Sequence, residues 1–105
     1  MSSQDPAGRR VHERYDRKLP VVIVHGEREI HCTTRNISLG GLFVDTGEKL
    51  PFGAKARVRM RLPALKEQTE VPVTVRWITD EGIGVQFGSL RALEVWALNQ
   101  LFKQE

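Results

Sequence analysis

The chain has 105 residues, of which 40% are hydrophobic and 28% are charged, and its formal net charge is +3. This length supports one domain with a single modest core, and a two-domain organisation is not expected. The longest apolar run, Leu19 to Val24, is far too short to span a bilayer. The small positive charge favours anionic partners without selecting among a nucleotide, a nucleic acid and a membrane surface.

Residues 1–8 lack the basic and apolar regions of a secretory signal, so we expect a flexible tail on a cytoplasmic protein. The single cysteine, Cys32, excludes an internal disulfide, agrees with that location and is expected in the core. Positive charge is then concentrated over residues 9–18. The basic residues of this segment are Arg9, Arg10, Arg14, Arg17 and Lys18. We call residues 9–18 the arm and expect it to attract anions.

Six strands are predicted within residues 19–87, because these segments are rich in β-branched residues or alternate between apolar and polar positions, and turn residues bound them. The predicted strands are Leu19–Val24, Arg28–Arg35, Leu42–Val44, Ala54–Leu62, Val71–Trp77 and Ile83–Phe87. The first two should form a hairpin centred near Gly26-Glu27. Its register places Arg17 opposite Asn36 and Arg14 near Leu39, and a β-bulge would shift this pairing by one residue.

After Gly88 the apolar period changes to that of a helix, which we expect over residues 89–104 with Ser89 as its cap. The apolar positions of this helix are Leu90, Leu93, Trp96, Ala97, Leu98, Leu101 and Phe102. Trp77 and Trp96 are expected to be packing residues. Six short strands followed by one helix predict a mainly β fold, an antiparallel barrel or sandwich with the helix at one end.

Two motifs are candidates for function: Arg10-x-x-x-Arg14 before the first strand, and Asn36-x-Ser38-x-x-Gly41 after the second. An arginine fork can bind phosphate oxygens or guanine O6 and N7, and it can stack on a purine. Asparagine can bond a guanine edge, serine can offer its hydroxyl, and glycine permits close backbone approach or positive φ. Separately, the motifs also fit a solvated basic tail and an Asx turn. Together they favour a site for an anionic purine ligand.

With these motifs the chain resembles a PilZ domain, whose signature is RxxxR before the first strand and [D/N]xSxxG after the second. The resemblance continues through Gly-Leu-Phe-Val, Val-Arg-Trp-Ile and Gly-Ile-Gly-Val-Gln-Phe, and it covers nearly all of the chain after Arg9. It implies a six-stranded antiparallel PilZ-type β-barrel over residues 19–87, with a C-terminal α-helix, in a single domain of residues 9–105.

The resemblance also implies a receptor for cyclic di-GMP. Our hypothesis for its mechanism is that the arm folds over the dinucleotide, and that an effector protein reads the changed surface. The ligand-binding residues implied by the resemblance are Arg10, Arg14, Asn36, Ser38 and Gly41. Arg9, which lies next to the first motif, is an additional candidate. One or two cyclic di-GMP molecules per chain, and a monomer or a homodimer, remain open.

Two alternatives remain: a PilZ-like protein-interaction module without ligand control, and a basic nucleic-acid-binding β-barrel. The second would use the stripe Lys55, Arg57, Arg59 and Arg61. We do not favour it, because charges on an exposed strand face also prevent edge association and no interleaved aromatic residues are present for base stacking. The sequence has no nucleophile motif and no histidine spacing typical of metal ligands, so we expect a non-enzyme without a cofactor or metal.

Overall fold

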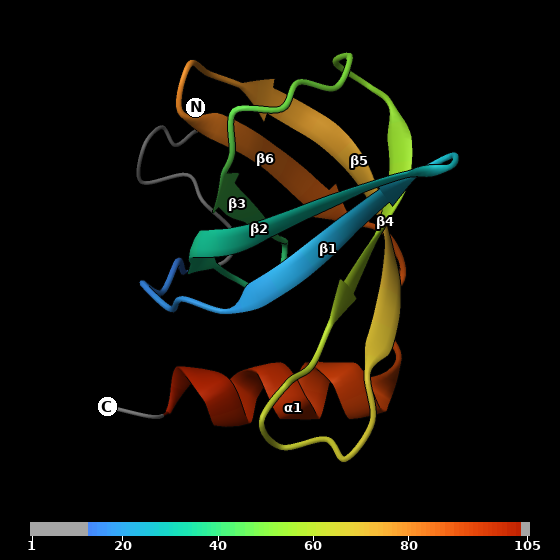
Figure 1. The fold of residues 1–105 in the computed structure, drawn as a ribbon. Coiled ribbons are helices and arrows are strands. Elements are labelled where there is room, and N and C mark those ends of the chain that lie inside the picture. The colour runs from blue at the N-terminus through green and yellow to red at the C-terminus, as the bar shows by residue number, and fades with distance from the viewer. Residues whose placement is uncertain (1–12, 104–105) are drawn as a thin grey trace, which may run out of the picture.

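The computed structural model describes residues 13–103. Its elements are β1 (Pro20–His25), β2 (Arg28–Ile37), β3 (Gly41–Asp45), β4 (Lys55–Met60), β5 (Thr69–Ile78), β6 (Gly82–Phe87) and α1 (Ala92–Phe102). The strands close into an antiparallel barrel in the order β1-β2-β3-β6-β5-β4, and α1 lies across one end of it (Figure 1). The predicted fold, a six-stranded antiparallel barrel with a C-terminal helix, is confirmed.

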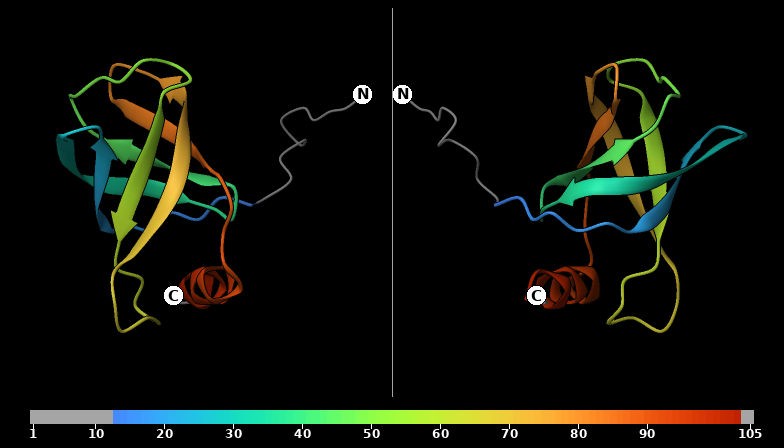
Figure 2. Two further views of the ribbon diagram at one scale, coloured as in Figure 1. Left: turned by 90° about the vertical axis from the view of Figure 1, so that its right-hand side faces the viewer. Right: turned by 60° about the vertical axis from the view of Figure 1, so that its left-hand side comes forward.

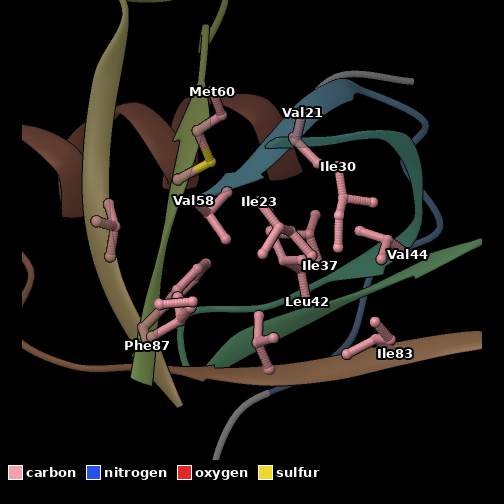
Figure 3. Packing of buried hydrophobic residues seen from close by; sticks show 14 of the residues in the cluster. Val21, Ile23, Ile30, Ile37, Leu42, Val44, Val58, Met60, Ile83 and Phe87 are labelled. Carbon is pink, nitrogen blue, oxygen red and sulfur yellow. The ribbon is translucent and has the colours of Figure 1, made fainter. Parts of the chain in front are cut away.

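The barrel interior is filled by side chains that alternate inward along the strands. Ile23, Ile37, Val58 and Ile83 are completely buried, and Figure 3 shows residues of β1, β2, β3, β4 and β6 meeting in this core. Burying an aliphatic side chain of this size stabilises the fold by about 1.5–3 kcal/mol. Cys32 is only partly buried and packs against the core rather than inside it.

The β1–β2 hairpin has the predicted register: Pro20 faces Thr33, and His25 faces Arg28. Its turn includes Gly26 with a φ of 61°, a conformation that glycine adopts without steric cost. Before β1, the pairing shifts by one residue, and Tyr15 forms an isolated bridge with Ile37 through two N–H···O bonds of 2.9 Å. The described part of the arm, residues 13–18, therefore runs beside the end of β2. Residues 1–12, which include Arg9 and Arg10, lie outside the described residues.

The arm also contacts the end of α1. The Tyr15 and Phe102 rings stack with centroids 4.2 Å apart and an interplanar angle of 8°. Arg17 donates hydrogen bonds to the carbonyl oxygens of Leu101 (3.2 Å) and Phe102 (3.0 Å). A cation at the carbonyl end of a helix interacts favourably with the helix dipole. The Arg17 side chain thus contacts the end of α1, whereas the simple hairpin extension predicts only its backbone register, opposite Asn36.

The start of α1 differs from the sequence prediction. The helix begins at Ala92 with Arg91 as its N-cap, so the prediction that Ser89 caps it was wrong. The reason is Glu94, which is 2% exposed and accepts a 2.9 Å hydrogen bond from the backbone N–H of Arg91. The same carboxylate is held by the hydroxyl of Thr69 at the start of β5. Figure 2 shows the β4–β5 connection reaching down beside α1, and Thr69 begins the strand that follows this connection.

The two tryptophans also differ from expectation. The prediction that Trp77 and Trp96 are packing residues was wrong, because each residue is 50% exposed.

Within residues 13–103, no helix is long and apolar enough to cross a membrane.

Candidate ligand-binding site

A pocket of about 580 Å³ lies on the outer surface of the barrel, between the arm, β2, β3, β5 and the β5–β6 turn. Its lining residues are Arg14, Arg35, Asn36, Phe43, Trp77, Thr79 and Glu81. This volume is within the range of small-ligand sites. Two arginines and two aromatic rings suit a ligand that carries both negative charge and flat bases.

Arg14 joins the arm to the pocket. Its Nη1 atom donates a 2.8 Å hydrogen bond to Oδ1 of Asn36, and its guanidinium carbon lies 5.5 Å from the centroid of the Trp77 ring. The adjacent Tyr15–Ile37 bridge fixes the backbone that carries Arg14. Arg14 therefore lies close to the second motif, as hairpin register predicts. The bridge differs from the predicted register by one residue, and the Arg14 side chain bonds that of Asn36.

Two β-bulges orient the pocket residues. In β2, Thr34 pairs with Val44 and Asn36 pairs with Phe43, so Arg35 is the extra residue. In β5 the register shifts in the same way between Val75 and Trp77. A bulge interrupts the alternation of faces along a strand. Without it, Trp77 would continue the inward series that ends at the fully buried Val75.

Gly84 leaves room for the aromatic rings of the pocket. It lies between Phe43 and Trp77 and pairs with both across the sheet. A Cβ atom on Gly84 would lie 2.7 Å from Cε3 of Trp77 and 3.3 Å from Cδ2 of Phe43. The absence of a side chain at this position is thus what allows the indole ring to approach β6 closely.

Arg35 is the second arginine that lines the pocket. Its guanidinium carbon lies 5.0 Å from the centroid of the Phe43 ring, and it makes ion pairs with Asp45 and, at 3.0 Å, with Glu81. Hydrogen bonds from Arg35 to Asp45 and then to Glu81 raise the pKa of the guanidinium above its ordinary value. The pocket therefore contains two arginines that each lie over an aromatic ring, and the charge of Arg35 is balanced by Asp45 and Glu81.

Comparison with known proteins identifies the family of this fold. The family model of the PilZ domain matches residues 8–104. This chain belongs to the PilZ domain family. Domains of this family are generally receptors for cyclic di-GMP. No match was found among curated proteins.

Two solved structures resemble this PilZ domain. The Bacillus subtilis inhibitor of motility (MotI/DgrA) is 32% identical, with a TM-score of 0.74. The similarity covers 90% of this chain and 49% of that one, so the chain spans about half the length of MotI/DgrA. The PilZ domain of CeSA from a cellulose-synthesizing bacterium has a TM-score of 0.67 at 17% identity, over 86% of this chain and 94% of that chain. At 17% identity, this similarity shows that the two chains share a fold.

Ser38 and Gly41 of the PilZ motif do not line the pocket. The Ser38 side chain is 6% exposed, and its Oγ accepts hydrogen bonds from the N–H groups of Gly40 (3.0 Å) and Gly41 (3.2 Å). A Cβ on Gly41 would lie 2.1 Å from the carbonyl oxygen of Val85, so β3 and β6 approach closely there. Both residues build the turn that follows Asn36, and a direct contact between either of them and a ligand stays a prediction.

Five pocket residues of this PilZ domain were missing from the sequence prediction. They are Arg35, Phe43, Trp77, Thr79 and Glu81. The sequence shows the aromatic and basic residues of the segments around Arg35 and Trp77, but it does not show the bulges that turn these side chains outward.

Within residues 13–103, no three His, Cys, Asp or Glu side chains gather closely enough to hold a metal ion.

Proposed function

We propose that this PilZ domain is a non-enzymatic receptor that binds cyclic di-GMP in the pocket and signals its presence to a partner protein. The observation that carries the proposal is the position of Arg14, whose guanidinium is held between the Asn36 side chain and the Trp77 ring. An arginine fixed on an aromatic ring presents its N–H groups and its outer face to a phosphate or a purine.

The chemistry of the ligand matches this arrangement. Cyclic di-GMP carries two phosphates and two guanines, and arginine pairs with phosphate oxygens and with guanine O6 and N7. In the proposed complex Arg14 contacts the ligand, Trp77 supports it from behind, and the Asn36 amide bonds a guanine edge. Arg9 and Arg10 supply further positive charge from the preceding part of the arm. Ser38 and Gly41 hold the turn that positions Asn36.

Signalling would follow from the place of the arm. Its residues form part of the pocket through Arg14 and part of the surface around α1 through Tyr15 and Arg17. Ligand contacts with the arm would therefore alter the surface that a partner reads, and the phosphate charges would offset the cost of ordering it.

The basic stripe on β4 gives less support to nucleic-acid binding. Arg57 and Arg59 each lie 3.3 Å from a carboxylate oxygen of Glu70, and Arg59 also lies 3.6 Å from Glu29. These neighbouring carboxylates reduce the positive potential along the strand, whereas phosphate binding depends on an excess of it. We therefore keep the dinucleotide pocket as the proposed site.

Calorimetric titration of the purified protein with cyclic di-GMP tests the proposal, with GTP and cyclic di-AMP as controls. We expect saturable binding of cyclic di-GMP alone. Arg14→Ala should weaken it by roughly ten- to a hundredfold, because a hydrogen bond to a charged group contributes about 1.5–3 kcal/mol. Arg57→Ala, which removes an acid-paired arginine outside the pocket, should leave the affinity unchanged.

Neither heat nor thermal stabilisation with cyclic di-GMP would instead favour a PilZ-shaped interaction module without ligand control. Unchanged affinity in Arg14→Ala, with binding intact in the parent protein, would remove Arg14 from the site.

A further inference from the structure

Arg35 and Glu81 form an ion pair in the lining of the pocket that also contains Arg14, and neither belongs to the two sequence motifs. We propose that this pair is a guanine-reading subsite that receives a second base in the same pocket. The inference rests on the proposed function, and it assigns the residues that distinguish guanine from adenine.

The first step is the chemical pattern of the base. Guanine presents acceptors at N7 and O6, next to donors at N1 and N2. Arg35 offers donors and Glu81 offers acceptors, and their charged groups are 3.0 Å apart. A base lying across the pair can therefore accept from Arg35 through O6 and N7 while it donates to Glu81 through N1–H and N2–H. Adenine has a donor in place of O6 and an unprotonated N1, so it mismatches both partners.

The second step is how firmly Arg35 is placed. The bulge in β2 puts Arg35 on the outer face beside Asn36, and bulges commonly re-aim side chains next to binding sites. Its guanidinium lies over the Phe43 ring and is also paired with Asp45. The pocket thus repeats one arrangement twice: Arg14 over Trp77 and Arg35 over Phe43. A ligand with two identical bases suits two such arrangements.

The alternative is a structural role, in which the ion pairs join β2, β3 and the β5–β6 turn. The side chains of Arg35 and Asp45 are each 41% exposed, and that of Glu81 is 70% exposed. Ion pairs in such positions contribute little to stability, because solvent screens them. A structural role alone also gives no reason for the pair to line the pocket that contains Arg14 and Asn36.

The test is calorimetric titration of the full chain with cyclic di-GMP, cyclic di-AMP and cyclic di-IMP, a relative of cyclic di-GMP that lacks the N2 amino groups. Arg35→Gln should weaken cyclic di-GMP binding by about five- to 150-fold, the value of one bidentate contact to a base. Glu81→Gln removes a negative charge near an anionic ligand, and this change can strengthen the binding of all three ligands. The quantity to compare is therefore the ratio of the affinities for cyclic di-GMP and cyclic di-IMP. We expect the preference for cyclic di-GMP over cyclic di-IMP to disappear in this variant.

The matched controls are Arg28→Gln and Glu48→Gln, which break an Arg–Glu pair of similar exposure outside the pocket. They should leave the affinity and the preference unchanged. Normal affinity in Arg35→Gln and an unchanged preference in Glu81→Gln would overturn this subsite and leave the proposed function in place. An equal loss of affinity for all three ligands, together with a melting temperature below that of the controls, would assign a structural role to the pair. This result would also overturn the guanine subsite. Absence of cyclic di-GMP binding by the unmodified protein would overturn both proposals.

Discussion

Glu94 shows how a single buried carboxylate fixes the position of α1. Burial raises the pKa of Glu94, but hydrogen bonds from Arg91 and Thr69 lower it further, so the net pKa lies below the ordinary value. The carboxylate is therefore charged in the folded protein although its side chain is only 3% exposed. Such a group stabilises the fold only while its hydrogen-bonding partners remain in place.

We predict a pH-dependent contribution to stability from Glu94. Because its pKa is lower in the folded than in the unfolded chain, the contribution is complete above the unfolded pKa of about 4.3 and is lost as the pH falls through the folded pKa. Glu94→Gln should lower the free energy of unfolding by about 1.5–3 kcal/mol at pH 7, and the difference from the parent protein should shrink below about pH 4. Urea unfolding between pH 7 and pH 3 measures this.

Glu67→Gln is the control, because Glu67 is exposed on the β4–β5 connection. It should have no more than a small effect at any of these pH values. A deficit in Glu94→Gln that stays constant down to pH 3 would contradict the role given to the charge.

At the scale of strands, alternation of apolar residues was sufficient to place all six elements within a few residues of their observed bounds. The register of β1 and β2 was also predictable, because a short turn at Gly26 leaves little freedom in the pairing. The bulges in β2 and β5 could not be predicted, because a bulge depends on how a strand pairs with its partner. The alternation of residues along a single strand does not reveal it. This is why Trp77 was predicted to be a packing residue and Arg35 was not predicted to line the site.

The start of α1 was mispredicted for a related reason. The apolar spacing from Leu90 onward fits a helix that begins at Ser89 as well as one that begins at Ala92. The choice depends on Glu94 and its contact with Thr69, which lies in another element. The apolar periodicity of one segment gives no information about contacts with a residue in another element.

Gly84 provides a test at this scale. Because a Cβ there would lie 2.7 Å from the Trp77 ring, Gly84→Ala should displace the indole. We expect a loss of stability of about 1–3 kcal/mol, the usual cost of overpacking, and an affinity for cyclic di-GMP that is lower by about tenfold. Tryptophan fluorescence, chemical unfolding and calorimetry give the three readouts.

Gly47→Ala is the matched variant, since nothing lies within 4 Å of the added methyl group there. It should resemble the parent protein in all three measurements. If Gly84→Ala also resembles the parent, the indole does not depend on the open space at this glycine.

At the scale of the whole molecule, the arm connects the pocket on one side of the barrel with the helix at its end. Arg14 lies in the pocket, while the next residue, Tyr15, stacks on Phe102 of α1. Loss of the Tyr15–Phe102 stack should therefore affect the position of Arg14 in the pocket. Tyr15→Ala should lower the affinity for cyclic di-GMP by about fivefold or more, the size of a typical coupling between sites, and should lower the melting temperature.

Tyr15→Phe keeps the aromatic stack and removes only a long 3.4 Å hydrogen bond from the hydroxyl to Glu13, so it should behave like the parent protein. Calorimetry and thermal unfolding of the two variants make the comparison. An affinity in Tyr15→Ala equal to that of the parent would show that the pocket and the helix act independently.

The stack of Tyr15 on Phe102 also brings two residues near the two ends of the described part of the chain together, with the ring centroids 4.2 Å apart. A polypeptide that enters the barrel at Tyr15 and leaves at Phe102 does so at almost one place. Such a unit can be inserted into a surface loop of a host protein with little strain on the host. For the same reason, a short peptide linking the two ends should allow new termini to be opened at an exposed turn on the far side of the barrel.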